Sequence, residues 1–594
     1  MPRSKGVTVL LPVILSAAMA MDRVAGGTSP VGDRLRAAYC STLDSLAAAL
    51  EAIGDAARRS STPDVVASVR HARLAFKGAE GLLEYFDGMT AVVLNGRESE
   101  EADADDDQTS PQSDPAHGFA ALDSLRAAPD GAPSFAEVSR HAELMARSVR
   151  YSRSLAKHLT FGEPQLFDAA RLELIRIGTL GIAGYDAAIP SDRAAEAAAA
   201  LRGLRRALAV SLSTTAATAA ARRETDARIV AAIARLERTS ANELDAFGFI
   251  ANGLYPAARA LNAERRIRGT RLPPSPSALR TSADFVFDRD AFDLVRYAPG
   301  HEVDTGIALA AIGRKLFTNR ALSGDGTRSC ATCHHADRAF TEPLARTATI
   351  DSVGRGSSRN TPTLINAALQ PALFADLRVR SLEDQVATVI ASPTEMRGDL
   401  DSAAARVGMS KHVIQAALAA YVRTLIALDS RFDRAVRGDT TAITPSERSG
   451  FNVFMGKARC GTCHFAPFFG GTVPPDYWST PPEVIGVPER SDGGVIDPDL
   501  GRGAVDDQLF HRHAFRTPTL RNVGVTPPYM HNGAFRTLDE VIDFYDRGGG
   551  AGRGLDVPNQ TLRREKLGLT ADERSDLIAF LESLTDTLIA RRRR

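Results

Sequence analysis

Residues 330–334 read Cys-Ala-Thr-Cys-His, and residues 460–464 read Cys-Gly-Thr-Cys-His. In each stretch two thiols lie within one helical turn and a histidine follows at once, which is the attachment pattern for c-type haem. The thiols form thioethers with the haem vinyl groups, and the histidine then lies beneath the iron as its proximal ligand. The sequence therefore predicts two covalent haems, one held by Cys330, Cys333 and His334, the other by Cys460, Cys463 and His464.

Two other uses of paired cysteines stay open at this point. A structural zinc site would draw four ligands from paired knuckles and would leave both histidines unexplained. A thioredoxin-like redox pair would explain one C-x-x-C but not its repetition. The fifth cysteine, Cys40, is predicted to lie on an apolar helix face.

The second half of the chain contains an internal repeat. Besides the two haem motifs, Thr-Pro-Thr-Leu-Ile-Asn at residues 361–366 recurs as Thr-Pro-Thr-Leu-Arg-Asn at 517–522. Two copies of one unit are the simplest explanation. Capping-box patterns at residues 444–447 and 570–573 predict helix starts on either side of the second copy.

The first half of the chain has a different composition and pattern. It is rich in alanine, and apolar residues recur at helical spacing. We expect a mainly α protein in which a helical N-terminal domain precedes two cytochrome-c-like haem domains. The predicted divisions are a signal peptide at 1–20, a helical domain at 21–270, a Pro/Ser-rich linker at 271–290, and haem domains at 291–440 and 441–594. An acidic run at residues 98–107 is predicted to be an exposed loop.

Charge and hydropathy restrict the cellular location and the kinds of partner that can be expected. The 594 residues carry 72 basic and 72 acidic side chains, so no basic excess exists for binding nucleic acid. A basic start with Arg3 and Lys5, an apolar stretch at 7–15 and the small-x-small pattern at 18–20 predict a cleavable export signal. No other stretch is long and apolar enough to predict a transmembrane segment. The expected location is the periplasm.

Six stretches of the second half follow one another in a recognisable order: residues 323–334, 359–366, 381–385, 393–396, 457–464 and 528–533. Together they resemble the bacterial diheme cytochrome c peroxidase and MauG superfamily, from about residue 300 to 585. The N-terminal half is outside this resemblance. Residues 73–87 are faintly similar to imelysin-like helical domains, but the histidine-glutamate motif is missing, so no site follows from it.

The resemblance implies that the first haem binds hydrogen peroxide and the second relays or stores oxidising equivalents. Glu395 matches the family's distal acid and Gln385 its companion amide, as peroxide cleavage needs a group that moves a proton. Ordinary helix-surface residues are the alternative reading of both. Residues 336–373 contain neither histidine nor methionine, so we expect the first iron to be open.

The second haem's distal ligand separates two branches of the family. The position fourteen residues after His531 (531 + 14 = 545) holds methionine in typical peroxidases and tyrosine in MauG-type enzymes, and here it is Tyr545. A phenolate stabilises high oxidation states of iron better than a thioether does. The alternative is that Tyr545 only packs in its helix and Met530 ligates the iron.

Two further features follow from the resemblance. The family's inter-haem tryptophan is replaced here, because the motif reads Phe-Ala-Asp at 374–376, and the only tryptophan is Trp478. Haem-to-haem charge sharing is therefore slow or uses another aromatic residue. The family's calcium ion would be held by Asn360, Thr526 and Pro528, since oxygen-only ligation suits a hard cation.

The predicted function is that of a periplasmic diheme oxidoreductase. It either reduces peroxide with electrons from a small redox protein, such as a cytochrome c or cupredoxin, or, like MauG, oxidises an organic or protein substrate. The rival is a non-catalytic electron carrier, which would need both irons six-coordinate. A third reading is a binding module whose haems only sense redox state.

Overall fold

The computed structural model describes residues 29–96, 117–127, 134–185, 189–239, 244–299, 306–344 and 359–586. The expected signal peptide and acidic loop lie outside these residues. The prediction of a mainly α fold is confirmed, since one two-residue strand pair is the only sheet within the described ranges. Within those ranges no helix combines the length and the apolar character that crossing a membrane requires.

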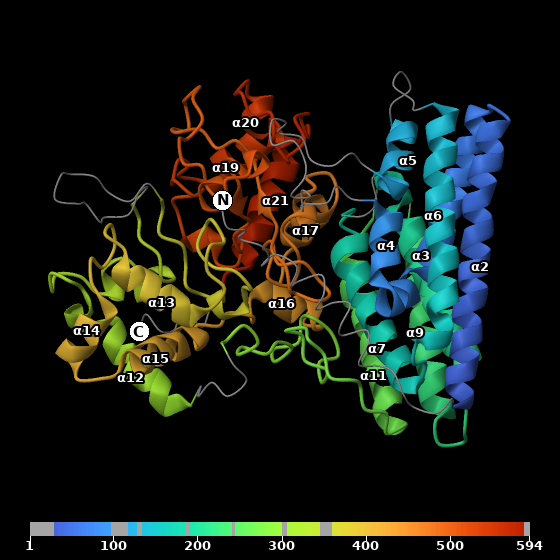
Figure 1. Cartoon of the computed structure of the whole chain (residues 1–594), viewed down its shortest axis with the longest axis horizontal. Helices are drawn as coiled ribbons and strands as arrows, with labels where there is room; N and C mark the ends of the chain where they lie inside the picture. Colours follow the sequence, from blue (N-terminus) through green and yellow to red (C-terminus); the bar gives the residue numbers. More distant parts are fainter. Residues whose placement is uncertain are drawn as a thin grey trace, which may run out of the picture.

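The helical half is a bundle, seen upright in Figure 1. Its longest helix, α2, packs along α3 and α6. Serine side chains cap all three helices at their N-termini, and Cys40 packs partly buried against the bundle core as predicted. The elements are α2 (Pro30–Arg58), α3 (Thr62–Phe86), α4 (Gly88–Asn95), α5 (Gly118–Ala127), α6 (Phe135–Leu155), α7 (Glu163–Arg176), α8 (Arg193–Ser211), α9 (Ala219–Glu237), α10 (Ala246–Phe249) and α11 (Tyr255–Ile267).

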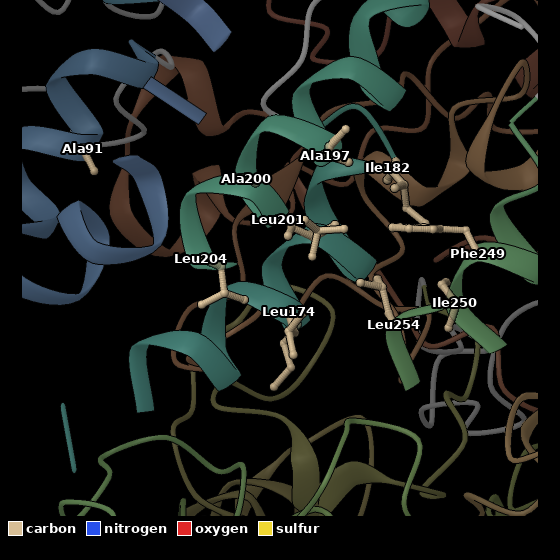
Figure 2. Close-up of a cluster of buried hydrophobic side chains, with 14 of the residues drawn as sticks. Ala91, Leu174, Ile182, Ala197, Ala200, Leu201, Leu204, Phe249, Ile250 and Leu254 are labelled. Carbon is tan, nitrogen blue, oxygen red and sulfur yellow. The ribbon is translucent and has the colours of Figure 1, made fainter. Parts of the chain in front are cut away.

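Two π-helical turns interrupt the bundle where it meets the second haem domain. They are η2 (Ile177–Gly181), which continues α7, and η4 (Ile250–Leu254), which joins α10 to α11. Figure 2 shows Leu174, Leu201 and Leu254 among the buried side chains of this region, with Ile182 next to Phe249. The η2 turn contacts η9 (Cys460–Thr462), which contains the first cysteine of the second haem motif, and η4 contacts α16 (Arg431–Val436). The two π-helical turns therefore lie at the junction between the two halves of the chain.

The two haem domains repeat one helix arrangement. In the first, α12 packs against α15, and in the second α17 packs against α21. Capping boxes begin α17 and α21 at Thr444 and Thr570, as predicted. The main elements are α12 (Ile307–Phe317), α13 (Leu382–Ala391), α14 (Leu400–Val407), α15 (Lys411–Arg423), α16 (Arg431–Val436), α17 (Pro445–Met455), β1 (Pro482–Glu483), α18 (Gly503–Asp506), β2 (Phe515–Arg516), α19 (Leu538–Asp546), α20 (Gly549–Gly552) and α21 (Ala571–Ser583).

The hydrophobic core does not follow the expected domain divisions. One continuous cluster runs from the helical bundle into the second haem domain, while the first haem domain has separate clusters. Phe285 and Phe287, in the segment expected to be a linker, are buried in the shared cluster. Phe432 precedes the expected boundary at 440, yet it packs against Phe451 and Phe580 of the second haem domain.

Candidate functional site

One large cavity of about 1910 Å³ contains both C-x-x-C-H turns. Ordinary small-molecule pockets have volumes of roughly 300–1,000 Å³, so this cavity has room for more than one large ligand. Glu395, Gln385, Tyr545 and Met530 also line it. The structure thus brings the predicted catalytic and ligand residues to one internal space.

The two motifs have the same local geometry. The short turns η6 (Cys330–Thr332) and η9 (Cys460–Thr462) present the cysteines, and each histidine main-chain N–H donates to the first cysteine's carbonyl. His334 Nδ1 lies 2.9 Å from the Phe340 carbonyl oxygen, and His464 Nδ1 lies 3.1 Å from that of Phe469. A carbonyl can only accept, so Nδ1 carries the proton and Nε2 keeps the lone pair that an iron ligand needs.

Burial keeps these groups neutral. It lowers the pKa of His334, and that of His464 to about 4, although the Phe340 and Phe469 carbonyls, which accept from the two imidazoles, oppose the shift. Pro362 and Pro518, in the repeated Thr-Pro-Thr stretches, line the same cavity.

The cysteines do not resemble zinc ligands. A structural zinc site binds four ligands, drawn mostly from cysteine and histidine side chains. No group of three or more His, Cys, Asp or Glu side chains that could hold a metal ion occurs in the described part of the chain.

The cavity also fits the carboxylates of a haem. Arg516 lines it, and burial lowers the pKa of its guanidinium to about 10. No described carboxylate forms an ion pair with Arg516. Arg459 and Arg563 line the cavity too, and burial together with the nearby Arg563 lowers the pKa of Arg459. Cations that line a cavity without a carboxylate partner indicate a negatively charged ligand, and two propionates on each haem are of that kind.

Glu395 reaches the cavity from the loop after α13, the helix that carries Gln385. Its Oε2 atom is buried and has no hydrogen-bond partner. Burial raises the pKa of this carboxyl group, and the guanidinium groups of Arg378 and Arg359 oppose that rise. A carboxyl group with an unpartnered oxygen and a raised pKa is suited to moving a proton.

Those two arginines belong to an ion-pair network that sequence reasoning did not find. Arg359 binds Asp499 through two hydrogen bonds of 2.6 and 2.9 Å, and it also donates to Asp376 at 2.5 Å. Arg378 donates to the same Asp376 oxygen and stacks 3.6 Å over the Phe374 ring. The network joins the two haem domains close to Glu395. Its members are far apart in the sequence, and only the family motifs at residues 359–366 and 374–376 gave a signal for any of them.

Tyr545 lies on α19, which begins with a capping box at Thr537. Burial raises its pKa, and Cys463, Cys460 and Glu483 add to the shift, so Tyr545 lies near the second cysteine pair. Its hydroxyl makes no hydrogen bond to any described residue. Met530 lines the same cavity in the left-handed backbone region, at φ +70°.

The Phe-Ala-Asp segment at 374–376, which lacks the family's tryptophan, is contacted by the second haem domain. The Arg516 main-chain N–H donates to the Ala375 carbonyl at 2.7 Å, and its Nε donates to that of Phe374. Next to Arg516, the Phe515 ring stacks on His531 with centroids 3.7 Å apart. Trp478 does not line the cavity.

Two of the three expected calcium ligands meet between the haem domains. Asn360 Nδ2 lies 2.6 Å from the Pro528 carbonyl oxygen, and the Asn360 main-chain N–H donates to the His531 carbonyl. Asn360 Oδ1 is buried and has no hydrogen-bond partner. Thr526 lines the same cavity.

The helical half also contributes to the cavity wall, which the sequence did not predict. Gly184 and Tyr185 line it, and the Tyr185 ring packs edge-on against Phe465, directly after His464. Arg193 anchors this contact by donating to the Met455 carbonyl at 2.6 Å.

A mainly helical chain whose two C-x-x-C-H turns open into one cavity defines a diheme c-type protein. Residues 308–441 match the family model described as di-haem cytochrome c peroxidase. The methylamine utilization protein MauG of Methylophilus methylotrophus is 35% identical over 298 residues, which cover 46% of this chain and 82% of that protein. The cytochrome-c peroxidase IdrP2 of Denitromonas iodatirespirans is 31% identical over 309 residues, covering 47% and 81% respectively.

Among solved structures, a MauG-like protein associated with microbial copper homeostasis is 33% identical and covers 49% of this chain and 93% of its own, with a TM-score of 0.41. The chain belongs to the diheme cytochrome c peroxidase and MauG family and is a peroxidase-family enzyme of that kind. The family implies two c-type haems and hydrogen peroxide as a reactant, as the sequence predicted.

Proposed function

We propose that the enzyme is exported to the periplasm, where it reacts with hydrogen peroxide at the first haem and directs the oxidising power, like MauG, at an organic or protein substrate. Cys330, Cys333 and His334 would hold the first haem, and Cys460, Cys463 and His464 the second. The observation that carries this proposal is the buried, unpartnered Glu395 oxygen in the cavity of the first motif.

When bound, the first haem supplies an open iron position at which peroxide is reduced. Glu395 accepts a proton from one peroxide oxygen and returns it to the other, which then leaves as water. The Gln385 amide, which lines the same cavity, donates a hydrogen bond that orients the peroxide. Arg378 and Arg359 favour the ionised carboxylate that must accept the first proton.

Glu395→Gln tests this role. The variant cannot take up the proton, so we expect the rate of reaction with peroxide to fall by about 10²-fold or more while haem content is unchanged. Because burial raises the Glu395 pKa above 4.5, the wild-type rate should fall as the pH drops through that raised value. Stopped-flow spectra across pH check both points. Glu489→Gln, at an exposed site, is the control, and an unchanged rate in Glu395→Gln would remove Glu395 from the mechanism.

Tyr545 supports the MauG-like choice over simple peroxide reduction with electrons from a small redox protein. A phenolate ligand at the second haem makes reduction difficult and storage of oxidising equivalents easy. An oxidised-state EPR spectrum discriminates the readings. One high-spin haem supports an open catalytic site, whereas two low-spin haems would favour the non-catalytic carrier or a redox-sensing binding module.

We also propose a calcium ion between the haem domains, held by Asn360, Thr526 and Pro528. The support is the buried Asn360 Oδ1, which accepts no hydrogen bond, together with the Pro528 carbonyl oxygen, which lies beside the same side chain and accepts from its Nδ2. We expect metal analysis of the purified protein to find about one calcium per chain, because oxygen-only sites select hard cations. Asn360→Leu should remove that calcium and Asn559→Leu should not. Equal calcium content in both variants would exclude the site.

A further inference from the structure

The only tryptophan of the chain, Trp478, has 45% of its surface exposed. An exposed aromatic side chain is ordinary by itself. What distinguishes Trp478 is that the residues beneath it connect it to the second haem motif. Its sequence neighbour Tyr477 is fully buried, and the Tyr477 hydroxyl donates to the Ala466 carbonyl at 3.2 Å. Ala466 is two residues after His464, the predicted proximal ligand.

A third aromatic residue completes this connection. The Tyr297 hydroxyl donates to the main-chain carbonyl of Tyr477, and the Tyr297 ring centroid lies 6.5 Å from that of Trp478. We call Tyr297, Tyr477 and Trp478 the aromatic relay. The ring of Tyr477 is held between Phe292 and Phe468, at centroid distances of 5.1 and 5.3 Å. The relay therefore runs from the surface to the segment of the second haem motif through bonded or touching groups.

Proton chemistry decides which relay residue can retain an oxidising equivalent. Tyrosine gives up an electron readily only when its phenol proton can leave. The Tyr477 hydroxyl faces a carbonyl, which is not a base, and burial raises the pKa of Tyr477 well above its ordinary value. Burial raises the pKa of Tyr297 as well. Trp478 is the relay member whose ring meets water, so its indole N–H proton can pass to solvent.

A cation beside Trp478 acts in the same direction. The Arg296 guanidinium lies 5.0 Å from the Trp478 ring centroid. It repels a positive charge on the oxidised indole and thereby favours loss of the N–H proton, which leaves a neutral radical.

We propose that Trp478 is a surface oxidation site at which donors too bulky for the haem cavity, such as polymer-linked or protein-borne phenols, are oxidised one electron at a time. The proposal rests on the proposed peroxide reaction. Peroxide takes two electrons and two protons to give two waters, and two Trp478 oxidations supply these electrons. Each time, the indole loses one electron inward through Tyr477 and one proton to water. A phenol then returns one hydrogen atom to the indole and leaves as a phenoxyl radical.

The test uses the full haem-loaded chain and a phenol coupled to a large soluble dextran. We expect Trp478→Phe to lower kcat/KM for dextran-phenol at least tenfold, while the stopped-flow reaction with peroxide stays within twofold of wild type. Trp478→Tyr should retain much of the activity, because an exposed tyrosine can also release its proton. Tyr151→Phe, at a residue 64% exposed in the helical half, is the control and should change nothing.

A second readout does not depend on turnover. With peroxide and no donor, EPR should show an organic radical that Trp478→Phe abolishes, and mass spectrometry should find oxygen added to Trp478. Unchanged dextran-phenol oxidation, or an unchanged radical, in Trp478→Phe would overturn the surface site while leaving the peroxide reaction intact. A wild-type protein whose haems do not react with peroxide would overturn both proposals.

Discussion

Tyr545 is held in place by local and non-local features together. The capping box at Thr537 sets the start of α19, and the spacing along that helix points Tyr545 into the cavity near Cys463. Its hydroxyl has no competing hydrogen-bond partner among the described residues. The Tyr545 oxygen is therefore available to a haem iron in the cavity, which is the ligation that we propose.

We therefore predict that Tyr545→Met raises the reduction potential of the second haem, because a neutral thioether stabilises ferric iron less than a phenolate does. Potentiometric titration followed by absorbance measures the shift, and the near-infrared band of histidine–methionine ligation should appear. Met530→Leu is the matched control and should leave the potential unchanged. If Met530→Leu instead abolishes such a band in the wild-type background, Met530 is the ligand and the MauG-like assignment fails.

At the scale of elements, a glycine allows the main helix pair of each haem domain to cross closely. A Cβ atom at Gly313 of α12 would lie 1.8 Å from the Ala417 carbonyl oxygen of α15. A Cβ atom at Gly450 of α17 would lie 1.9 Å from that of Asp576 in α21. The equivalent contact occurs in both copies, so the structural repeat includes the crossing of the main helix pair.

Gly450→Ala should therefore destabilise the second haem domain. In a solvent-exposed helix, replacing glycine by alanine would stabilise the helix by up to about 1 kcal/mol. Here the added methyl group must push α17 and α21 apart, which costs about 1–3 kcal/mol or more. Denaturant unfolding followed at the second haem measures the effect. Gly494→Ala is the control, as its Cβ would meet nothing within 4 Å. Equal stability of the two variants would contradict this account of the crossing.

At the scale of the whole molecule, the helical half and the second haem domain share one hydrophobic cluster, so we expect them to behave as one folding unit. Arg193 and Tyr185 of the helical half also contact the second haem segment. The first haem domain has its own clusters and meets the second through polar contacts such as those of Arg359. The helical half therefore acts as a structural wall of the second haem site.

This arrangement predicts that Leu201→Ala, deep in the helical bundle, lowers the stability of the second haem domain. Loss of a fully buried leucine costs about 2–5 kcal/mol, and a shared core transmits the loss. Thermal melts should show helical circular dichroism and the second haem's absorbance shifting down together. Leu322 is equally buried in the first haem domain, so Leu322→Ala should instead lower the temperature of the transition that is followed by the first haem's absorbance. A second-haem transition unmoved by Leu201→Ala would show that the two parts unfold independently.

Sequence alone determined the features whose physics is local. The C-x-x-C-H turns at Cys330 and Cys460 need only one helical turn of chain, and the capping boxes at Thr444 and Thr570 need only four residues, so both could be predicted. The mainly α fold followed from periodicity, and Glu395 and Tyr545 could be proposed as site residues because their spacing within matched motifs could be counted.

Only the tertiary structure decided what depends on contacts between distant segments. The Arg359 network spans 140 residues between Arg359 and Asp499, and no local pattern marks it. The residues expected to form a linker turned out to carry buried phenylalanines, because burial depends on what packs against a segment and not on its proline content. For the same reason Trp478, which matched no motif in the sequence, gained a possible role only when Tyr477 was seen beneath it, hydrogen-bonded to the segment of the second haem.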